Sequence, residues 1–279
     1  MSNSQHPVAL RLERLAGGST ALLATVMFLP LIDGIFPALL LAGALDDPIG
    51  ILQVGVLVFG GSATLAVILA EMDGTPREQA KIVLLIGIPL VIVAAIEAAL
   101  APTIASVLDL VIFERFAALV IAAIAAHTAS ARIGEYMPRP AIIVALGVVA
   151  SIDPAGAQLV LSPDPGLVAR GVAAAAIGVV FALSVALLGP WLRETMDIDR
   201  FRFGSAVALG MLALAVLGVV PDGAPLVVLV VVGVLAFDPA SEVRRVTTEA
   251  FADGGRSSGG SEESRSADDE RDIEREPWL

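Results

Sequence analysis

The feature that most constrains the fold is a succession of apolar runs separated by short polar turns. A helix needs about 20 consecutive, mostly apolar residues to cross a lipid bilayer, and several of these runs reach that length. Hydrophobic residues make up 57% of the chain and its mean hydropathy is +0.86. Soluble domains are only roughly half apolar. The sequence therefore predicts an all-α protein, a polytopic transmembrane helix bundle embedded in a lipid bilayer.

We expect about eight spans, organised as two four-span repeats. The first repeat covers residues 19–130 and the second covers 141–238. A short cytoplasmic N-terminus at 1–18 and a disordered acidic cytoplasmic tail at 247–279 flank them. The expected spans are about 19–44, 49–71, 80–101 and 107–130 in the first repeat, and about 141–161, 167–190, 203–220 and 224–237 in the second. The eighth is short for a full crossing and is expected to be thin, tilted or re-entrant.

Proline and charged residues mark the expected connections. We expect Pro102 to close the third span, and charged loops at 131–140 and 191–202. The Asp47-Pro48 and Asp164-Pro165 pairs are typical of turns between elements. They lie 117 residues apart (164 minus 47) and belong to an ordered series of matching positions in the two halves. This series is the basis for predicting an internal repeat.

The basic residues predict the orientation. With the N-terminus in the cytoplasm, eleven Lys and Arg residues flanking the spans lie inside, and only Arg115 and Arg170 lie outside. Such a bias follows the positive-inside rule. Both termini are then cytoplasmic, and the two four-span units share one orientation. Their pseudo-two-fold axis would run along the membrane normal, as in transporters with parallel repeats. We therefore expect a multi-pass protein of the cell membrane.

Composition also excludes several kinds of chemistry. The chain has no cysteine, which rules out disulfides, thiolate metal sites and thiol redox chemistry. Its two histidines, His6 and His127, are too few for a histidine-built metal centre, and His127 is expected to be solvated at the inner end of the fourth span. No nucleotide-binding, zinc-protease or serine-hydrolase motif occurs. We expect no catalytic residues, no metal, no cofactor and no nucleic-acid partner, so the chain is not predicted to be an enzyme.

The charge is acidic and almost free of lysine. The net charge is −12, and Lys81 is the only lysine among 17 basic residues. Dense carboxylates keep exposed segments soluble at high salt, so this pattern indicates a halophilic organism with a salt-rich cytoplasm. Codon bias toward Arg and Ala is the alternative, and both can hold. From Asp238 onward the chain has twelve acidic residues and six arginines, with few apolar residues. Such a tail cannot bury enough surface to fold, which predicts disorder.

Two aspartates inside apolar spans, Asp33 and Asp153, are the leading candidates for a functional site. Each is accompanied by helix breakers, namely Pro30, Gly34 and Pro37 in the first span and Pro154 and Gly156 in the fifth. A charged carboxylate at the bilayer centre costs about 2.5–3.5 kcal/mol on insertion scales, so both should face the bundle interior. A broken helix beside a carboxylate often forms an ion or substrate site. The alternative is structural: each Asp caps the second half of a broken helix.

The predicted repeat has a consequence for these two residues. Equivalent residues lie across a central axis, so Asp33 and Asp153 should approach each other near mid-membrane. Two carboxylates at such a short distance titrate as one unit, and they share a proton or bind one cation. Further candidates for the substrate or ion site are other polar residues within the spans: Glu97, Gln53 and Gln158. The two glutamines are expected first to form hydrogen bonds between helices and only second to contact a substrate. Span glycines such as Gly60, Gly61, Gly171 and Gly178 are expected to allow close helix packing.

The two aspartate-bearing segments carry a family resemblance. The acidic, lysine-poor chain with LIDGIFPALL and SIDPAGAQLVLSP resembles uncharacterised multi-spanning membrane proteins of halophilic archaea, over residues 10–240. An Asp and a Pro in the first span of each repeat is also distantly similar to LysE/TerC-like exporters of amino acids and metal ions. Those exporters usually have inverted three-span repeats, whereas this chain is predicted to have parallel four-span units. No residue roles are therefore carried over.

Together these patterns predict a secondary transporter or permease for a small solute or ion, with the paired intramembrane aspartates at its centre. Its partners would be the lipid bilayer and a small solute, a proton or a cation. The alternative is a non-transport structural or assembly membrane protein in which the aspartates only cap broken helices. A membrane-embedded enzyme acting on lipid is a third class.

Overall fold

The computed structural model describes residues 18–153 and 164–237. Within them the chain is helical and forms no β-strand, only isolated bridges between Leu108 and Ile152 and between Met196 and Phe237. The predicted helix breakers Pro154 and Gly156, the candidate Gln158 and the predicted disordered tail at 247–279 lie outside the described residues.

Helices occur in each of the eight regions predicted as spans. The first span consists of α2 (Gly18–Ile32) and α3 (Ile35–Leu41), and the second consists of α4 (Pro48–Gln53), the π-helix η1 (Val54–Gly60), α5 (Ser62–Ala66) and the π-helix η2 (Val67–Glu71). The next are α6 (Pro76–Ala105), α7 (Leu110–Ala129), the short α8 (Ala131–Tyr136) and α9 (Pro140–Ser151). The last are α10 (Pro165–Thr195), α11 (Ile198–Val216) and α12 (Ala224–Ala236).

Several of these helices have the length and composition of membrane spans. Five pass on both criteria, and the bent pair Pro48–Gly60 and Ser62–Glu71 makes a sixth if it counts as one span. The two remaining segments are weaker: α12 has 13 residues, and α11 has 19 with charges in its first turns. By length and composition the chain thus has several helices that could span a membrane, while the full set of eight crossings stays a prediction.

Aspartate and proline determine where helices begin. Asp47 accepts hydrogen bonds from the N–H groups of Ile49 and Gly50, and Pro48 occupies the first helical position. Asp164 and Pro165 begin α10 in the same way. Capping by Asp satisfies donors that have no partner inside the helix, and proline loses nothing at the first position. The two Asp-Pro turns are therefore equivalent in local structure, as predicted.

The predicted ends of the helices are wrong at three places. Pro102 does not close the third span, because α6 continues through it to Ala105; a proline removes one backbone hydrogen bond, which here does not end the helix. The predicted charged loop at 191–202 is mostly helical as well. There α10 runs to Thr195 and α11 begins at Ile198, with Asp197 capping it by accepting from the Arg200 N–H. Part of the predicted loop at 131–140 is likewise helical, as α8.

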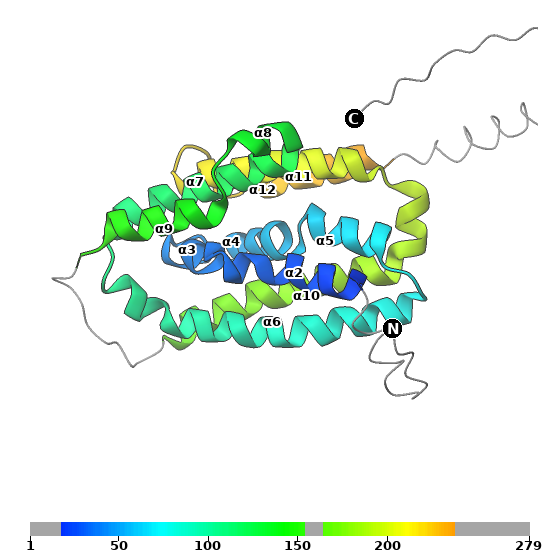
Figure 1. The fold of residues 1–279 in the computed structure, drawn as a ribbon, viewed down its shortest axis with the longest axis horizontal. Coiled ribbons are helices and arrows are strands. Elements are labelled where there is room, and N and C mark those ends of the chain that lie inside the picture. The colour runs from blue at the N-terminus through cyan, green and yellow to red at the C-terminus, as the bar shows by residue number, and fades with distance from the viewer. Residues whose placement is uncertain (1–17, 154–163, 238–279) are drawn as a thin grey trace, which may run out of the picture. The chain divides into compact units, whose positions relative to one another are not determined.

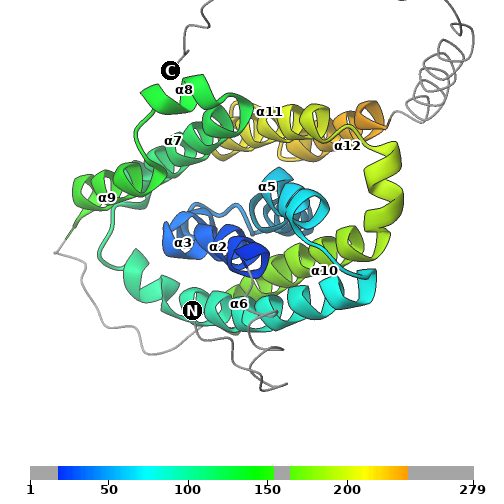
Figure 2. The same ribbon diagram turned by 45° about the vertical axis from the view of Figure 1, so that its right-hand side comes forward.

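The two broken spans lie between two layers of helices (Figures 1 and 2). α6 and α10 pack together on one side, and α7 packs with α9 and α11 on the other, where α12 joins α11. α3 contacts both α6 and α7, η1 and η2 contact α10, and α5 contacts α11. Many of the largest fully buried side chains belong to the broken spans, and the rings of Phe36 and Phe59 join them with centroids 5.3 Å apart. The broken spans therefore form the core.

The outer helices present apolar side chains away from this core. Exposed residues recur every three or four positions along α6, at Leu85, Ile88, Ile92, Ile96 and Leu100. That spacing places them on one face of the helix. A continuous apolar stripe of this kind suits contact with lipid rather than water.

The structure does not confirm the predicted internal repeat. The first span lies between two layers and 44% of its apolar window is buried, whereas the window of the fifth, Arg132–Ser151, is 17% buried. The third span packs extensively against the sixth through α6 and α10, whereas the pair that the repeat would make equivalent, the seventh and second spans, is in much smaller contact through α11 with α5 and η1. The equivalence of the two halves is thus seen in their Asp-Pro turns and not in their packing among the described residues.

Glycines allow η1 to approach α10 closely, as predicted for this kind of residue. A Cβ atom on Gly178 would lie 2.3 Å from the Phe59 Cβ and 3.0 Å from the Gly55 carbonyl oxygen. A Cβ atom on Gly55 would lie 2.7 Å from the Ala174 carbonyl oxygen. Since helices in lipid associate largely through van der Waals contact, small residues at such crossings are what make the contact possible.

Replacing Gly178 with valine should therefore destabilise the bundle. The added methyl groups have no space between η1 and α10, and overpacking of this kind costs about 1–3 kcal/mol. We expect a lower melting temperature for Gly178→Val in detergent. Gly210→Val is the matched control, because no atom lies within 4 Å of a Cβ at Gly210. Equal losses in the two variants would contradict the proposed close crossing.

Candidate functional site

The first span is interrupted at Asp33 and Gly34, as predicted. Pro30 has no N–H, so the Val26 carbonyl loses its usual helical donor. Gly34 adopts a left-handed conformation with φ 74°, and its N–H donates to the Leu31 carbonyl at 3.1 Å instead of to Pro30. Glycine takes this conformation without steric cost. The carbonyls of Val26 and Pro30 therefore lack the donors that a regular helix would give them.

Asp33 does not cap the second half of this broken span. The N-cap of α3 is Gly34, and no side chain accepts from the first N–H groups of the helix. The Asp33 carboxylate has no hydrogen bond or ion pair among the described residues, and the side chain is half-buried. The capping alternative is therefore wrong at this residue. An unpaired carboxylate within a span needs water or a ligand as its partner.

The second span is interrupted opposite the first. Its two parts meet at Gly61 with a bend of 43°. The π-helix η1 ends here, and Thr64 Oγ1 donates to the Phe59 carbonyl at 3.0 Å, satisfying one of the carbonyls at that end. π-helical turns are frequent at functional sites. Irregular backbone at membrane depth is tolerated where it is buried in protein or lines a cavity.

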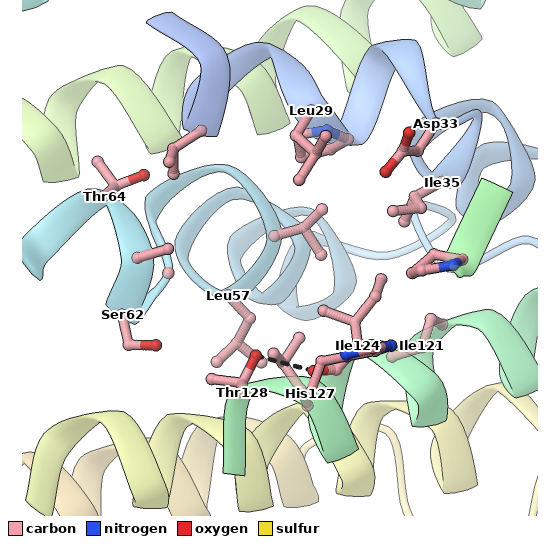
Figure 3. A pocket seen from close by; sticks show the side chains of 17 residues that line it. Leu29, Asp33, Ile35, Leu57, Ser62, Thr64, Ile121, Ile124, His127 and Thr128 are labelled. Atoms are coloured by element: carbon pink, nitrogen blue, oxygen red, sulfur yellow. Dashed lines mark hydrogen bonds between the residues drawn. The ribbon is translucent and has the colours of Figure 1, made fainter. Parts of the chain in front are cut away.

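A cavity of about 370 Å³ lies where the two breaks meet α7 (Figure 3). Asp33 and Ile35 project into it from the first span, Leu57, Ser62 and Thr64 border it from the second, and α7 forms the opposite wall. Its lining consists of Val26, Leu29, Pro30, Asp33, Ile35, Leu57, Val58, Gly61, Ser62, Ala63, Thr64, Ile121, Ile124, His127, Thr128, Pro140 and Leu209. The volume falls in the range of about 300–1,000 Å³ typical of small-molecule sites.

The cavity is apolar with a few polar groups. Among the described residues, Asp33 is the only acidic residue in its lining, and no Lys or Arg lines it. Thr128 Oγ1 donates to the Ile124 carbonyl at 2.8 Å, the interaction drawn in Figure 3. His127 lies on the wall formed by α7, and its Nε2 atom is buried without a hydrogen-bond partner among the described residues. Its ring packs against Gly134 of α8, where a Cβ would lie 2.4 Å from Nδ1.

The other predicted site residues lie away from this cavity. Asp153 follows the end of α9, where its N–H donates to the Val107 carbonyl at 2.9 Å and its side chain is exposed. Glu97 lies within α6, half-buried, with Oε2 unpartnered among the described residues. Neither residue lines the cavity beside Asp33. The structure therefore does not bring Asp33 and Asp153 together in one pocket.

Gln53 has the interhelical role that was predicted first. Its side chain is 2% exposed, and Nε2 donates to the Asp222 carbonyl in the connection between α11 and α12. A second cavity of about 210 Å³ lies around it, with Asp46, Asp47 and Asp222 among its lining residues. Arg170 of α10 forms an ion pair with Asp46 at this end of the bundle. The second cavity is thus acidic and lies beside the turn between the first two spans.

One arginine fixes the second half of the broken second span. Arg193 of α10 donates from Nε to the Leu69 carbonyl at 2.7 Å and from Nη2 to the Ile68 carbonyl at 3.2 Å. Gln79 donates to the Met72 carbonyl at 2.7 Å. The last carbonyls of a helix have no partner within it, and a guanidinium suits them because they carry negative partial charge. These contacts hold η2, and with it the Ser62–Ala66 segment, against α10.

Sequence reasoning missed the second wall of the cavity. Ser62, Thr64 and Thr128 were not predicted, and His127 was expected to be solvated at a membrane interface. The available signal was the Gly60-Gly61-Ser62 stretch, because adjacent glycines can break a helix as well as pack it. No group of three His, Asp or Glu side chains in the described parts of the chain is placed to hold a metal ion.

Comparison with known proteins finds one family. The family of unknown function DUF5794 matches residues 90–217, from the second half of α6 through α11. The match includes His127 and Asp153 and excludes Asp33. No curated protein and no solved structure matches the chain. A family without a known function is consistent with the resemblance expected from the sequence.

Replacing Arg193 with methionine should loosen the second span. The substitution keeps an apolar stem but leaves the carbonyls of Ile68 and Leu69 without their charged donor. Hydrogen bonds to charged groups are worth about 1.5–3 kcal/mol, and partial exposure reduces the expected loss to about 1–2 kcal/mol. Thermal unfolding in detergent measures it.

Arg200→Met is the control for this prediction. Arg200 pairs with Asp197 at 3.1 Å and its side chain is 60% exposed, so its loss should cost less than about 1 kcal/mol. A melting temperature for Arg193→Met no lower than that of Arg200→Met would show that the clamp on η2 is unimportant.

Proposed function

We propose that the chain is a secondary transporter or permease for a small solute or ion, with the cavity at Asp33 as its binding site. The observation that carries the proposal is the position of the Asp33 carboxylate. It lies at a helix break, caps no helix, has no partner among the described residues and projects into a cavity bordered by a second broken helix. Discontinuous helices meeting at a central site are the usual construction of secondary transporters.

A path through the bundle supports the same proposal. Gln53 lines the second cavity and Leu57 lines the first, four residues further along the same span. On α11, Leu212 lines the second cavity and Leu209 the first. Residues three or four apart lie on one face of a helix, so both cavities follow the same two helix faces. About one helical turn, roughly 5.4 Å, separates them.

The barrier between the cavities is apolar. Leu57, Leu209 and Leu212 are 2%, 5% and 2% exposed, so their side chains fill the space along this path. Hydrophobic constrictions close pores by excluding water. A shift of η1 against α11 would connect the two cavities, and the irregular backbone around η1 is a suitable place for such a movement. The described conformation thus corresponds to a closed barrier beside an accessible site.

The proposal includes the orientation and the eight crossings predicted from sequence. With both termini in the cytoplasm, Thr128 and Pro140 place the larger cavity toward the cytoplasmic side, and Asp46 and Asp222 place the smaller one outside. Arg193 and the basic residues at the start of α11 are then cytoplasmic, in keeping with the positive-inside rule. In this orientation the solute site is open to the cytoplasm and closed to the exterior.

The pairing of Asp33 with Asp153 stays a prediction with less support. Asp153 is exposed at the end of α9 and bonds through its backbone to the α6–α7 connection. A structural role for Asp153 agrees with this position, whereas Asp33 has none of the contacts that a structural role requires. The competing non-transport function is therefore supported by the position of Asp153 but not by that of Asp33.

Sided cysteine labelling tests the proposed path. The chain has no native cysteine, so single substitutions report without background. We expect Val58→Cys, in the larger cavity, to react with a membrane-impermeant thiol reagent from the cytoplasmic face of oriented vesicles. Ala215→Cys, in the smaller cavity, should react only from the exterior.

Ile96→Cys is the control for this labelling, since Ile96 is on the lipid-facing stripe of α6 and should react from neither face. Reaction of Val58→Cys and Ala215→Cys from the same face, or of neither, would contradict the path and with it the transport proposal.

A further inference from the structure

The lining of the larger cavity specifies what it binds. We infer that the ligand is a monovalent organic cation with a largely apolar body, bound with its charged group at Asp33. This inference rests on the proposed function, because it names the substrate class of the same site. Four features of the cavity lead to it: its formal charge, the backbone acceptors beside that charge, its apolar walls and its size.

The formal charge of the lining comes from one residue. Asp33 contributes a carboxylate; within the described ranges no Lys or Arg lines the cavity, and no residue pairs with Asp33. An unpaired charge away from water is costly, and a ligand of opposite charge removes that cost. A neutral ligand would leave the carboxylate unpaired, and an anion would add repulsion. The charge balance therefore selects a ligand with a single positive charge.

The backbone beside Asp33 adds to the negative character of this end. The carbonyls of Val26 and Pro30 both belong to lining residues. In a regular helix the Val26 carbonyl would accept from the N–H of residue 30, but Pro30 has none. The Pro30 carbonyl would accept from the Gly34 N–H, which donates to the Leu31 carbonyl instead. Backbone carbonyls at a helix break can hold cations in membrane transporters. Val26, Pro30 and Asp33 all line the cavity from the first span.

The rest of the cavity is unsuited to a bare metal ion. Calcium takes about six to eight oxygen ligands, and magnesium requires nearly octahedral oxygen coordination. The lining offers one carboxylate, and no group of three acidic or histidine side chains is found among the described residues. Most other lining side chains are apolar, including Leu29, Ile35 and Ile124. An ion without an apolar body would leave these walls in contact with nothing but water.

The size of the cavity favours a molecule rather than an ion. Its volume is about 370 Å³, several times the roughly 30 Å³ that one water molecule occupies in the liquid. The apolar side chains on α7 face Asp33 across this space (Figure 3). A ligand with one charged end and an apolar remainder places its charge against Asp33 and its body against α7. Amines and quaternary ammonium compounds with an aromatic or branched aliphatic group have this form.

Binding of four probes to the full-length protein in lipid nanodiscs tests the inference. Benzyltrimethylammonium combines a positive charge with an apolar ring, N,N-dimethylbenzamide is neutral, benzenesulfonate is an anion, and tetramethylammonium has the charge without the ring. Titration calorimetry should show benzyltrimethylammonium binding at least tenfold more tightly than each of the other three.

Variants then locate the binding to the cavity. Asp33→Asn should weaken benzyltrimethylammonium binding at least tenfold, and Asp33→Glu, which keeps the charge, should restore most of it. Asp73→Asn is the matched control, because Asp73 is exposed in the connection before α6 and lines neither cavity. This variant should bind benzyltrimethylammonium with the wild-type affinity. Ile124→Trp, which fills the cavity without touching a charge, should also abolish binding. It keeps the test valid if Asp33→Asn fails to fold.

The outcomes separate this inference from the proposed function. Equal binding of the neutral or anionic probe, or benzyltrimethylammonium affinity unchanged in both Asp33→Asn and Ile124→Trp, would overturn the inference. Charge-selective binding that depends on Asp33 would support it. Efflux of benzyltrimethylammonium from proteoliposomes is a separate measurement. Asp33-dependent binding without any efflux would leave the organic-cation site in place and contradict transport of this cation.

Discussion

Every backbone polar group inside a bilayer has to find a partner within the protein or in water, and this constraint determines where a membrane helix can be broken. In this chain the first span breaks at Asp33-Gly34 and the second at Gly61, and both breaks lie between the α6–α10 layer and the α7–α11 layer. The outer helices meet the lipid with regular backbone. The irregular backbone is thereby kept away from hydrocarbon and gathered around one cavity, which makes that cavity the natural place for a polar ligand.

The packing around the breaks explains how an irregular centre stays in place. Gly55 and Gly178 let η1 lie against α10 at backbone distance, and the Phe36 and Phe59 rings join the two broken spans to each other. Arg193 holds the end of η2 through the carbonyls of Ile68 and Leu69. The contacts of Gly55 and Phe59 hold η1, and those of Arg193 hold η2, so the two parts of the second span are held on either side of the bend at Gly61. The proposed binding site lies at this bend, beside the proposed barrier at Leu57.

The sequence predicted the helical membrane fold, the break at Asp33 and the packing role of the glycines, because apolar length, helix breakers and small residues each act locally. It did not predict that Asp33 and Asp153 lie in different surroundings. Their local sequences match, but the position of a span in a bundle depends on contacts between distant helices, as for α3 between α6 and α7. His127 was misjudged for the same reason: only the fold places the end of α7 beside the cavity.

In the proposed site Asp33 faces water inside the membrane, while the neighbouring side chain of Ile32 faces lipid. Ile32 is 75% exposed on the outer surface of the same span, so the two neighbours form a matched pair. The most direct measurement compares the rates at which Asp33→Cys and Ile32→Cys react with a small, charged thiol reagent added from the cytoplasmic side of oriented vesicles. Rapid modification of Asp33→Cys and none of Ile32→Cys is the predicted result. An unreactive Asp33→Cys in protein with wild-type melting behaviour, or equal rates at the two positions, would contradict a solute site at Asp33.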